Sequence, residues 1–443
     1  MAERLNVLHS WCVQSEWNAP EVVGGAGAHF FLANGRAILD MSSQSECSNL
    51  GHQHPRVVAA IREQAERLCY VANAWGAAPR AQLAERLLAL SGFEGGRVFF
   101  TLGGADANEN AVKLARQASR KRGGLIVARD RSYHGASFMG MALSGDSRTQ
   151  SQVDAKAMGV VHAPPPYFYR CPFGEKTDAA CGLRAAEAVA ECIDAAGAGR
   201  VAAVIMEPDA GANGIVAPDA YWPALRRQTA ERGVLLIADE VMSAFGRCGE
   251  WFAWQRHGEA GRPDLMTLAK GLTGAAIPLG AVVLSREVSA KLEHEMLYTG
   301  LTYCGHPLAC ATGVAALAAY EDEGLIERSR TLGASLLATL KEMQARRPVI
   351  GDVRGGHGLF AVIELVTDQA ARTPLAPWPH QAPALKALVD AALAEEGVSL
   401  ACRGNLIILA PPLVISERDL AEALSMLDRL LARFFPIVAE PRA

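Results

Sequence analysis

The sequence predicts an α/β protein with a large domain, built on a mostly parallel β-sheet, and a smaller α+β domain. Short apolar runs such as 234–238 and 265–269 are bounded by Gly, Pro or charged residues and alternate with helical patterns. That alternation is typical of a parallel sheet covered by helices. From about residue 324 the pattern becomes one of helices and separate strands, which is typical of an α+β domain distinct from the parallel sheet. We therefore assign residues 61–323 to the large domain, and residues 1–60 and 324–443 to the smaller one.

The N-terminal part is expected to begin with a β-hairpin. Apolar segments at 27–32 and 37–40 flank Asn34-Gly35, a pair typical of tight hairpin turns. The polar loop at 42–55 follows, and loops of this kind often carry function. The expected later elements are helices near 57–68, 80–92, 106–116, 183–196, 220–232, 308–321, 384–396 and 417–434, another beginning near 325, and strands at 98–101, 125–128, 201–206, 234–238, 265–269, 281–284, 359–365 and 406–409.

Composition excludes several classes of protein. The formal net charge is −4, so no broad basic surface for nucleic acid is expected. No apolar run of about 18 residues predicts a membrane-spanning helix, and the first residues lack the pattern of a signal peptide. The ten cysteines form no Cys-x-x-Cys pair, which favours reduced thiols and a cytoplasmic location. His52 and His54 lack further nearby ligands, so we expect no metal site.

Two chemically useful residues follow predicted strands. Asp239 ends the run 234–238, and Lys270 follows the run 265–269. Ligands of such sheets bind beyond the carboxyl ends of the strands. An enzyme that uses pyridoxal 5′-phosphate (PLP) needs a lysine amine for the cofactor aldehyde and a carboxylate for its ring nitrogen. The structural alternative is a solvated lysine and an aspartate that caps the next turn.

A strand, a glycine turn and a helix start meet at Gly103-Gly104-Ala105, an arrangement that can hold a phosphate on backbone N–H groups. Asp106 and Glu109 resemble a capping box at this helix start. The turn lacks the Gly-x-Gly-x-x-Gly fingerprint of a dinucleotide site, which disfavours a nicotinamide dehydrogenase.

Together these segments resemble the class III aminotransferases, or ω-transaminases, of the type I PLP fold, whose large domain has a seven-stranded sheet. The resemblance covers nearly the whole chain and is nearest the taurine and ω-amine subgroup. Its most specific segments are 239–241, 245–249, 263–264 with 269–271, and 302–307, with support from 356–359 and 410–413.

The resemblance implies a role for each matching residue. Lys270 would form the Schiff base and move the proton, with a pKa lowered by partial burial. Asp239 would meet the ring nitrogen, and Glu207 would support the hydrogen bonds beside it. The other PLP contacts would be Tyr133 and Val241 on the two ring faces, Gly104 and Ala105 at the phosphate, and Thr302 at the phosphate of the neighbouring subunit. The family is thus expected to form homodimers, with tetramers as the alternative.

Several residues depart from the family pattern, and they concern the substrate pocket. The phosphate turn has Gly103-Gly104-Ala105 in place of Ser-Gly-Ser. Glu46 stands where relatives have an apolar or aromatic residue, and a carboxylate there would disfavour a sulfonate. Ala276 replaces an aromatic residue and would widen the pocket. Asp209 replaces an apolar residue. Arg403 lies near the position of a mobile arginine that binds the acceptor carboxylate, against the alternative of a surface arginine.

We therefore expect a transaminase that moves an amino group from an ω-amine or a β- or ω-amino acid to a keto acid such as pyruvate, by a ping-pong mechanism. Two alternatives remain open. An aminomutase or a decarboxylase of the same family would keep the cofactor and change the reaction. A catalytically silent PLP-fold protein would act as a binding partner, although the presence of Lys270 and Asp239 argues against it.

Overall fold

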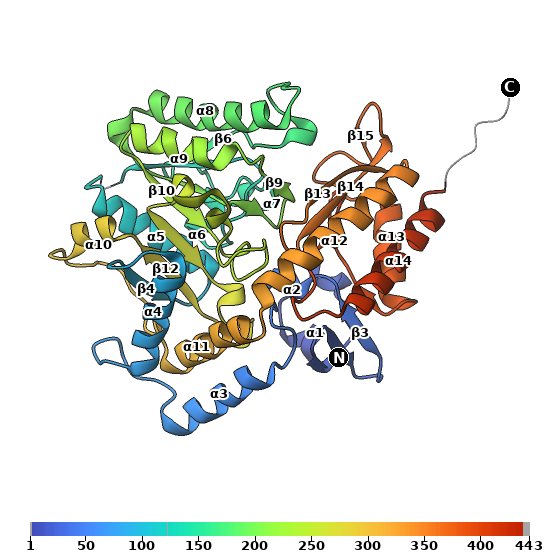
Figure 1. Cartoon of the computed structure of the whole chain (residues 1–443), viewed down its shortest axis with the longest axis horizontal. Coiled ribbons are helices and arrows are strands. Elements are labelled where there is room, and N and C mark those ends of the chain that lie inside the picture. The colour runs from blue at the N-terminus through green and yellow to red at the C-terminus, as the bar shows by residue number, and fades with distance from the viewer. Residues whose placement is uncertain (1, 122, 437–443) are drawn as a thin grey trace.

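The computed structural model describes residues 2–121 and 123–436. Its largest sheet has seven strands in the order β4-β12-β11-β10-β7-β5-β6 (Figure 1). Strand β12 runs antiparallel to both neighbours, and the remaining pairs are parallel. The predicted, mostly parallel sheet is therefore confirmed. The strands are β4 Arg97–Thr101, β5 Leu125–Arg129, β6 Val160–Ala163, β7 Val201–Met206, β10 Leu235–Asp239, β11 Leu265–Leu268 and β12 Gly280–Leu284.

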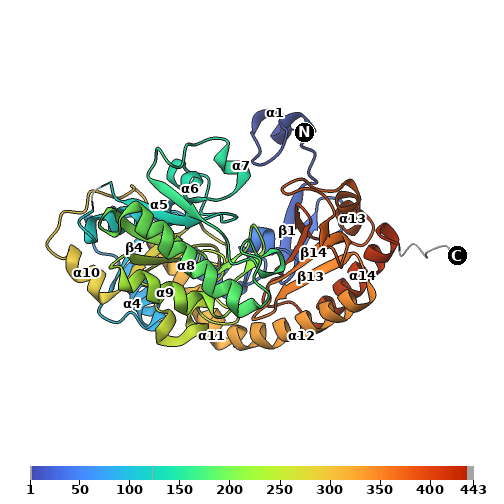
Figure 2. The same ribbon diagram turned by 90° about the horizontal axis from the view of Figure 1, so that it is seen from above.

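Two apolar cores lie on opposite faces of this sheet. Along β10, Leu236 and Ala238 belong to one core and Ile237 to the other, as the alternation of side chains along a strand requires. Helices α5 and α6 cover one face, and α8 and α9 cover the other (Figure 2). Both faces are buried, which explains the continuous apolar runs of the sequence. These helices are α5 Gly104–Ala118, α6 Phe138–Leu143, α8 Asp178–Ala196 and α9 Tyr221–Glu231.

The smaller part of the molecule brings the two ends of the chain together. Strand β3 (Ala37–Asp40) pairs in parallel with β16 (Val398–Ser399), so the N-terminal hairpin shares a sheet with the C-terminal region (Figure 1). This pairing accords with a smaller domain drawn from both ends, although the exact boundaries remain a prediction. The other strands here are β1 Val22–Ala26, β2 His29–Leu32, β13 Ile350–Gly355, β14 Ala361–Asp368, β15 Thr373–Pro374, β17 Ala401–Arg403 and β18 Leu406–Leu409.

The remaining helices connect these sheets and cover their edges. Helices α3 and α11 pack together beside the large sheet, and α12 leads from there into the C-terminal part. A two-stranded ribbon, β8 Asp209–Ala210 with β9 Ile215–Val216, follows β7. The helices are α1 Ala2–Asn6, α2 Ser43–Glu46, α3 Pro55–Arg67, α4 Ala78–Ser91, α7 Ser147–Gln150, α10 Arg286–Leu292, α11 Pro307–Asp322, α12 Leu325–Arg346, α13 Pro383–Ala394 and α14 Glu417–Phe434.

The predicted hairpin is confirmed as β2 and β3, joined through Asn34-Gly35. Strands β6 and β13 were not predicted, because both carry histidine, glycine or charged residues in place of an unbroken apolar run. In the described part of the chain, no helix is both long and apolar enough to span a membrane. Among the same residues no group of three His, Cys, Asp or Glu side chains could hold a metal ion.

Candidate active site

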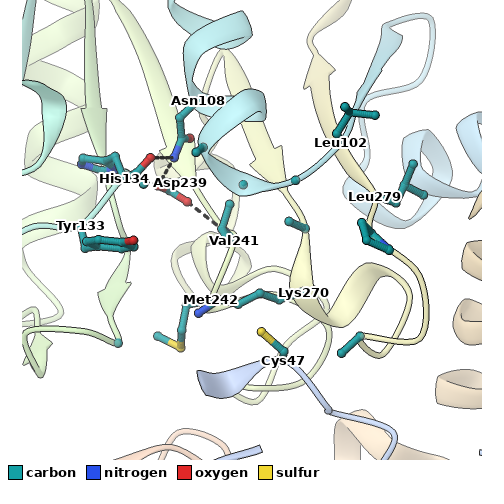
Figure 3. Close-up of a pocket in the computed structure, with 18 of the residues that line it drawn as sticks. Cys47, Leu102, Asn108, Tyr133, His134, Asp239, Val241, Met242, Lys270 and Leu279 are labelled. Carbon is teal, nitrogen blue, oxygen red and sulfur yellow. Dashed lines mark hydrogen bonds and ion pairs between the residues drawn. The ribbon is translucent and has the colours of Figure 1, made fainter. Parts of the chain in front are cut away.

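A cavity of about 390 Å³ lies beyond the carboxyl ends of β10 and β11 (Figure 3). The two strands are parallel, with Asp239 opposite Thr267, so both strands end at the same edge of the sheet. Asp239 and Lys270 both line this cavity. The structure therefore brings together the two residues on which the sequence-based interpretation depends.

Asp239 is held by three hydrogen-bond donors. Its Oδ2 accepts from Asn108 Nδ2 and from the Nδ1 position of His134, each at 2.7 Å, and its Oδ1 accepts from the Val241 N–H at 3.0 Å (Figure 3). The Asp239 side chain is only 3% exposed. Donors on this scale fix the orientation of a carboxylate. Asp239 is thus a carboxylate held in one orientation on the cavity wall.

Lys270 begins a short 3-10 turn directly after β11 and has a φ of 41°, a backbone conformation that is uncommon for non-glycine residues. Its Nζ donates to Oε2 of Glu46 at 2.9 Å. Burial lowers the pKa of the Lys270 amine, but the negative charges of Glu46, Cys47 and Asp239 together raise it above its usual value. The expectation of a lowered pKa is therefore wrong, because sequence reasoning did not pair Lys270 with Glu46.

The start of α5 forms a narrow wall of the cavity. A Cβ atom on Gly104 would lie 2.8 Å from Cγ1 of Val241, so a larger residue would displace a side chain that also lines the cavity. Gly135 similarly packs against Ala105 and has a φ of 115°. The free N–H groups of the first helical turn, with the helix dipole, suit an anion here. Gly104 and Ala105 thus lie where a phosphate could bind.

The predicted capping box at α5 is wrong. The residue before the helix is Gly103, which has no side chain to act as a cap. Asp106 lies within the first turn, and its Oδ2 accepts from the Leu102 N–H at 2.9 Å. Glu109 accepts from the Met139 N–H at 3.1 Å. Each carboxylate therefore ties α5 to a neighbouring segment.

Glu207 and Tyr133 also line the cavity and contact each other. Glu207 Oε2 accepts from Arg129 Nη2 at 3.1 Å and from the Tyr133 N–H at 3.3 Å. Burial raises the pKa of Glu207, and the nearby Arg129 guanidinium only partly offsets it. The Tyr133 ring is 6.3 Å from the ring of Trp11, and the Arg148 guanidinium lies over both rings. These contacts hold the Tyr133 ring in place at the cavity wall.

Three of the predicted residues are not among those that line this cavity. Arg403 forms an ion pair with Asp146 at 2.5 Å, which orients its guanidinium toward a carboxylate of its own chain. Ala276 is exposed, and its neighbours Ala275 and Ile277 are the ones that line the cavity. Thr302 is exposed on a surface segment. The roles given to all three remain predictions.

Sequence reasoning missed several lining residues. Asn108 lies one helical turn after Gly104, on the same face of α5, and this spacing is the signal that would have identified it. His134 follows Tyr133 directly and gives no such signal. Cys47 and Met242 enter from the segments beside Glu46 and Val241. Only the folded chain shows that these side chains meet.

The seven-stranded sheet, the lysine at a strand end and the carboxylate beside it define a PLP-dependent transferase site. The chain belongs to the class III aminotransferases, since the family model described as aminotransferase class-III matches residues 15–431. Aminotransferases of this class depend on PLP. The predicted family, enzyme class and cofactor are therefore confirmed.

Named relatives and a solved structure support this assignment. The structure of taurine:2-oxoglutarate aminotransferase from Bifidobacterium kashiwanohense, in complex with PLP and glutamate, matches with a TM-score of 0.92 and 35% identity, covering 97% of this chain and 96% of that one. Putrescine–pyruvate aminotransferase of Pseudomonas aeruginosa is 32% identical, over 94% of this chain and 91% of its own. Diaminobutyrate–2-oxoglutarate transaminase of Halomonas elongata is 33% identical, over 92% and 89%. The predicted type I fold is confirmed by these likenesses.

Proposed function

We propose that the protein moves an amino group from an ω-amine or a β- or ω-amino acid to a keto acid such as pyruvate, with PLP, in a ping-pong scheme. The observation that carries this proposal is the convergence of Lys270 and Asp239 on one cavity at adjacent strand ends. The names of the relatives reported above give taurine, putrescine or diaminobutyrate as one substrate, and pyruvate or 2-oxoglutarate as the other.

The residues of the cavity fit the chemical groups of PLP. The N–H groups at Gly104 and Ala105 suit its phosphate, and the buried carboxylate of Asp239 suits its ring nitrogen. Tyr133 and Val241 supply a flat and an apolar surface for the two faces of the ring. The small residues at this wall matter, because a side chain at position 104 would collide with Val241.

When bound, PLP supplies an aldehyde that links to an amine nitrogen and a ring that accepts electrons from the donor carbon. Lys270 Nζ is the nitrogen that this chain offers for attachment, and after release it is the base that moves a proton at the donor carbon. As an ammonium held by Glu46 Oε2 at 2.9 Å, Lys270 would have to lose a proton before its nitrogen could attach. Asp239, oriented by its three hydrogen-bond donors, would present its carboxylate to the ring nitrogen.

We also propose that the protein acts as a homodimer in the cytoplasm. Large apolar side chains are exposed around Thr302, which supports contact with a second subunit there. They are Met296, Leu297, Tyr298, Leu301 and Tyr303. All ten cysteines are free in the structure, which supports a reducing compartment. Molar mass by light scattering tests the dimer.

The reaction itself is tested by incubating the holoenzyme with pyruvate and one amine at a time, and measuring alanine, the product carbonyl compound and carbon dioxide by mass spectrometry. The proposal predicts equal amounts of alanine and carbonyl product and no carbon dioxide. The Lys270→Ala variant should lose turnover by several orders of magnitude. Release of carbon dioxide, an isomerised amine, or unchanged turnover in Lys270→Ala would instead support the decarboxylase, the aminomutase or the silent protein.

A further inference from the structure

Glu46 lies on a strained segment that is held in place from several sides. The four residues Ser43, Gln44, Ser45 and Glu46 all have positive φ angles of 47–67°, which form one left-handed turn. Non-glycine residues adopt this conformation only where the surrounding structure imposes it, and such segments cluster at functional sites. The strain indicates that the position of Glu46 is fixed by the fold.

Buried hydrogen bonds impose this turn. Oδ1 of Asp40 accepts from the N–H groups of Ser42 and Gln44, at 3.0 and 3.4 Å. The Ser43 hydroxyl donates to the Ala410 carbonyl at 2.6 Å and accepts from Arg247 Nη2 at 2.9 Å. The turn is thus joined to both the large domain and the C-terminal region.

The turn places the Glu46 carboxylate at the wall of the cavity. Glu46 is only 8% exposed, and a Cβ atom on Gly211 would lie 3.6 Å from its Cδ. Gly211, Met242 and Cys47 are lining residues, so Glu46 stands directly behind this part of the wall. Gly211 has no side chain that could separate the carboxylate from the cavity.

The structure already shows a primary alkylammonium group bound by this carboxylate, namely that of Lys270. In the proposed function, Lys270 Nζ becomes attached to the cofactor and then exchanged for the substrate. Glu46 then loses its cation, and a buried carboxylate without a partner is costly. A second cation beside Glu46 would offset this cost while Lys270 is attached to the cofactor or acts as a neutral base.

The other carboxylates of the cavity already have partners. Asp239 accepts from three donors and Glu207 from Arg129 and a backbone N–H. Among the described residues of this chain that line the cavity, Lys270 is the one lysine and there is no arginine. The electrostatic potential beside Glu46 therefore favours a cation and disfavours a carboxylate or sulfonate.

We propose that Glu46 forms a binding subsite for a second ammonium group on the amine donor, so that the enzyme takes short aliphatic diamines. This inference rests on the proposed transaminase function and names its substrate class. One ammonium exchanges with Lys270, and the other replaces Lys270 at the Glu46 carboxylate. An ω-amino acid that places its acidic group there is rejected by like charge.

The test mixes holoenzyme with one amine, without keto acid, and follows the conversion of the bound cofactor by absorbance. The matched probes are 1,4-diaminobutane and n-pentylamine. Both are linear and have the same number of non-hydrogen atoms, but the diamine ends in an ammonium group where pentylamine ends in a methyl group. For wild-type protein, the half-saturating concentration of the diamine should be about 10- to 100-fold lower than that of pentylamine. This range corresponds to the free energy of one charge-assisted hydrogen bond. Glu46→Gln should reduce this preference to within about threefold, and the ratio of the two half-saturating concentrations measures the preference even if the variant converts both amines more slowly. Glu46→Asp should keep part of the preference.

Glu323→Gln serves as the control, because it removes one negative charge at an exposed ion pair with His54. It should keep the full preference. The Lys270→Ala variant adds a measurement without turnover, since 1,4-diaminobutane should raise its melting temperature more than pentylamine does. Conversion by both amines with no wild-type preference, or a preference that survives Glu46→Gln, would overturn the inference and leave the transaminase intact. If no amine converts the cofactor, the proposed function itself fails.

Discussion

Replacing Asp239 with Asn changes one atom and tests the centre of the site. Oδ2 of Asp239 accepts from Asn108 and His134 at 2.7 Å each, and Oδ1 accepts from the Val241 N–H. An amide placed to keep the Val241 contact turns its own N–H groups toward Asn108 and His134. His134 can change tautomer and accept. Asn108 cannot adapt in the same way, because its Oδ1 already accepts from Thr267 Oγ1 at 2.7 Å.

The cost of Asp239→Asn follows from these contacts. One hydrogen bond to a charged group is lost, worth about 1.5–3 kcal/mol, and one buried donor is left unsatisfied, at about 1–3 kcal/mol. The free energy of unfolding should therefore fall by roughly 4 kcal/mol. A chain of 443 residues that unfolds as one unit has an unfolding entropy near 0.9 kcal/mol per kelvin, so the melting temperature should fall by about 4 °C.

The assay is thermal unfolding of cofactor-free protein, followed by titration with PLP. Asp264→Asn is the matched control, because Asp264 accepts from Arg226 and the Leu236 N–H at the opposite end of the same two strands. Both variants should be destabilised, but only Asp239→Asn should weaken PLP binding, by tenfold or more. Equal PLP affinity in wild type and Asp239→Asn, or equal weakening in Asp264→Asn, would refute the reasoning.

Three further predictions concern charged groups. Glu46→Gln should lower the pKa of Lys270, because the largest raising charge is removed while burial remains; the pH dependence of Lys270 acylation in cofactor-free protein measures it, and an unchanged pKa would contradict this. Arg403→Ala should destabilise the protein and leave the KM for the keto acid within about twofold, because Asp146 holds Arg403; a KM increase of tenfold or more would restore the acceptor role. Burial raises the pKa of Glu240 to about 7, so the folded state binds more protons than the unfolded state between about pH 4.5 and 7. Its contribution to stability falls as pH rises through that window, and Glu240→Gln should remove this slope from pH-dependent melting curves, whereas an unaltered slope would assign it elsewhere.

The sequence predicted the parts of the site that depend on local pattern. Asp239 ends one short apolar run and Lys270 follows another; runs of this length bounded by turn residues predict buried strands, and strand ends in such sheets face the ligand. The glycine turn at Gly104 is also a local signal, since strand, turn and helix follow one another in the chain. These features require no knowledge of which distant residues meet.

The sequence could not show contacts between distant segments. Glu46 reaches Lys270 only because a left-handed turn, held by Arg247, directs it there, and no apolar pattern records that geometry. The acceptor role of Arg403 was predicted from its neighbours in the chain and stays a prediction, while its ion pair with Asp146 is a contact that no local pattern records. Both contacts are ion pairs, which join residues far apart in sequence.

In the proposed function, Lys270 carries the cofactor until an amine substrate takes the place of Lys270 on it. The most direct measurement is the absorption spectrum of the purified protein with PLP, before and after a single amine is added without keto acid. The account predicts a band of covalently bound cofactor in the wild type that the amine converts to pyridoxamine 5′-phosphate, and no such band in Lys270→Ala. A wild-type protein that shows no bound cofactor, or a band that persists in Lys270→Ala, would contradict it.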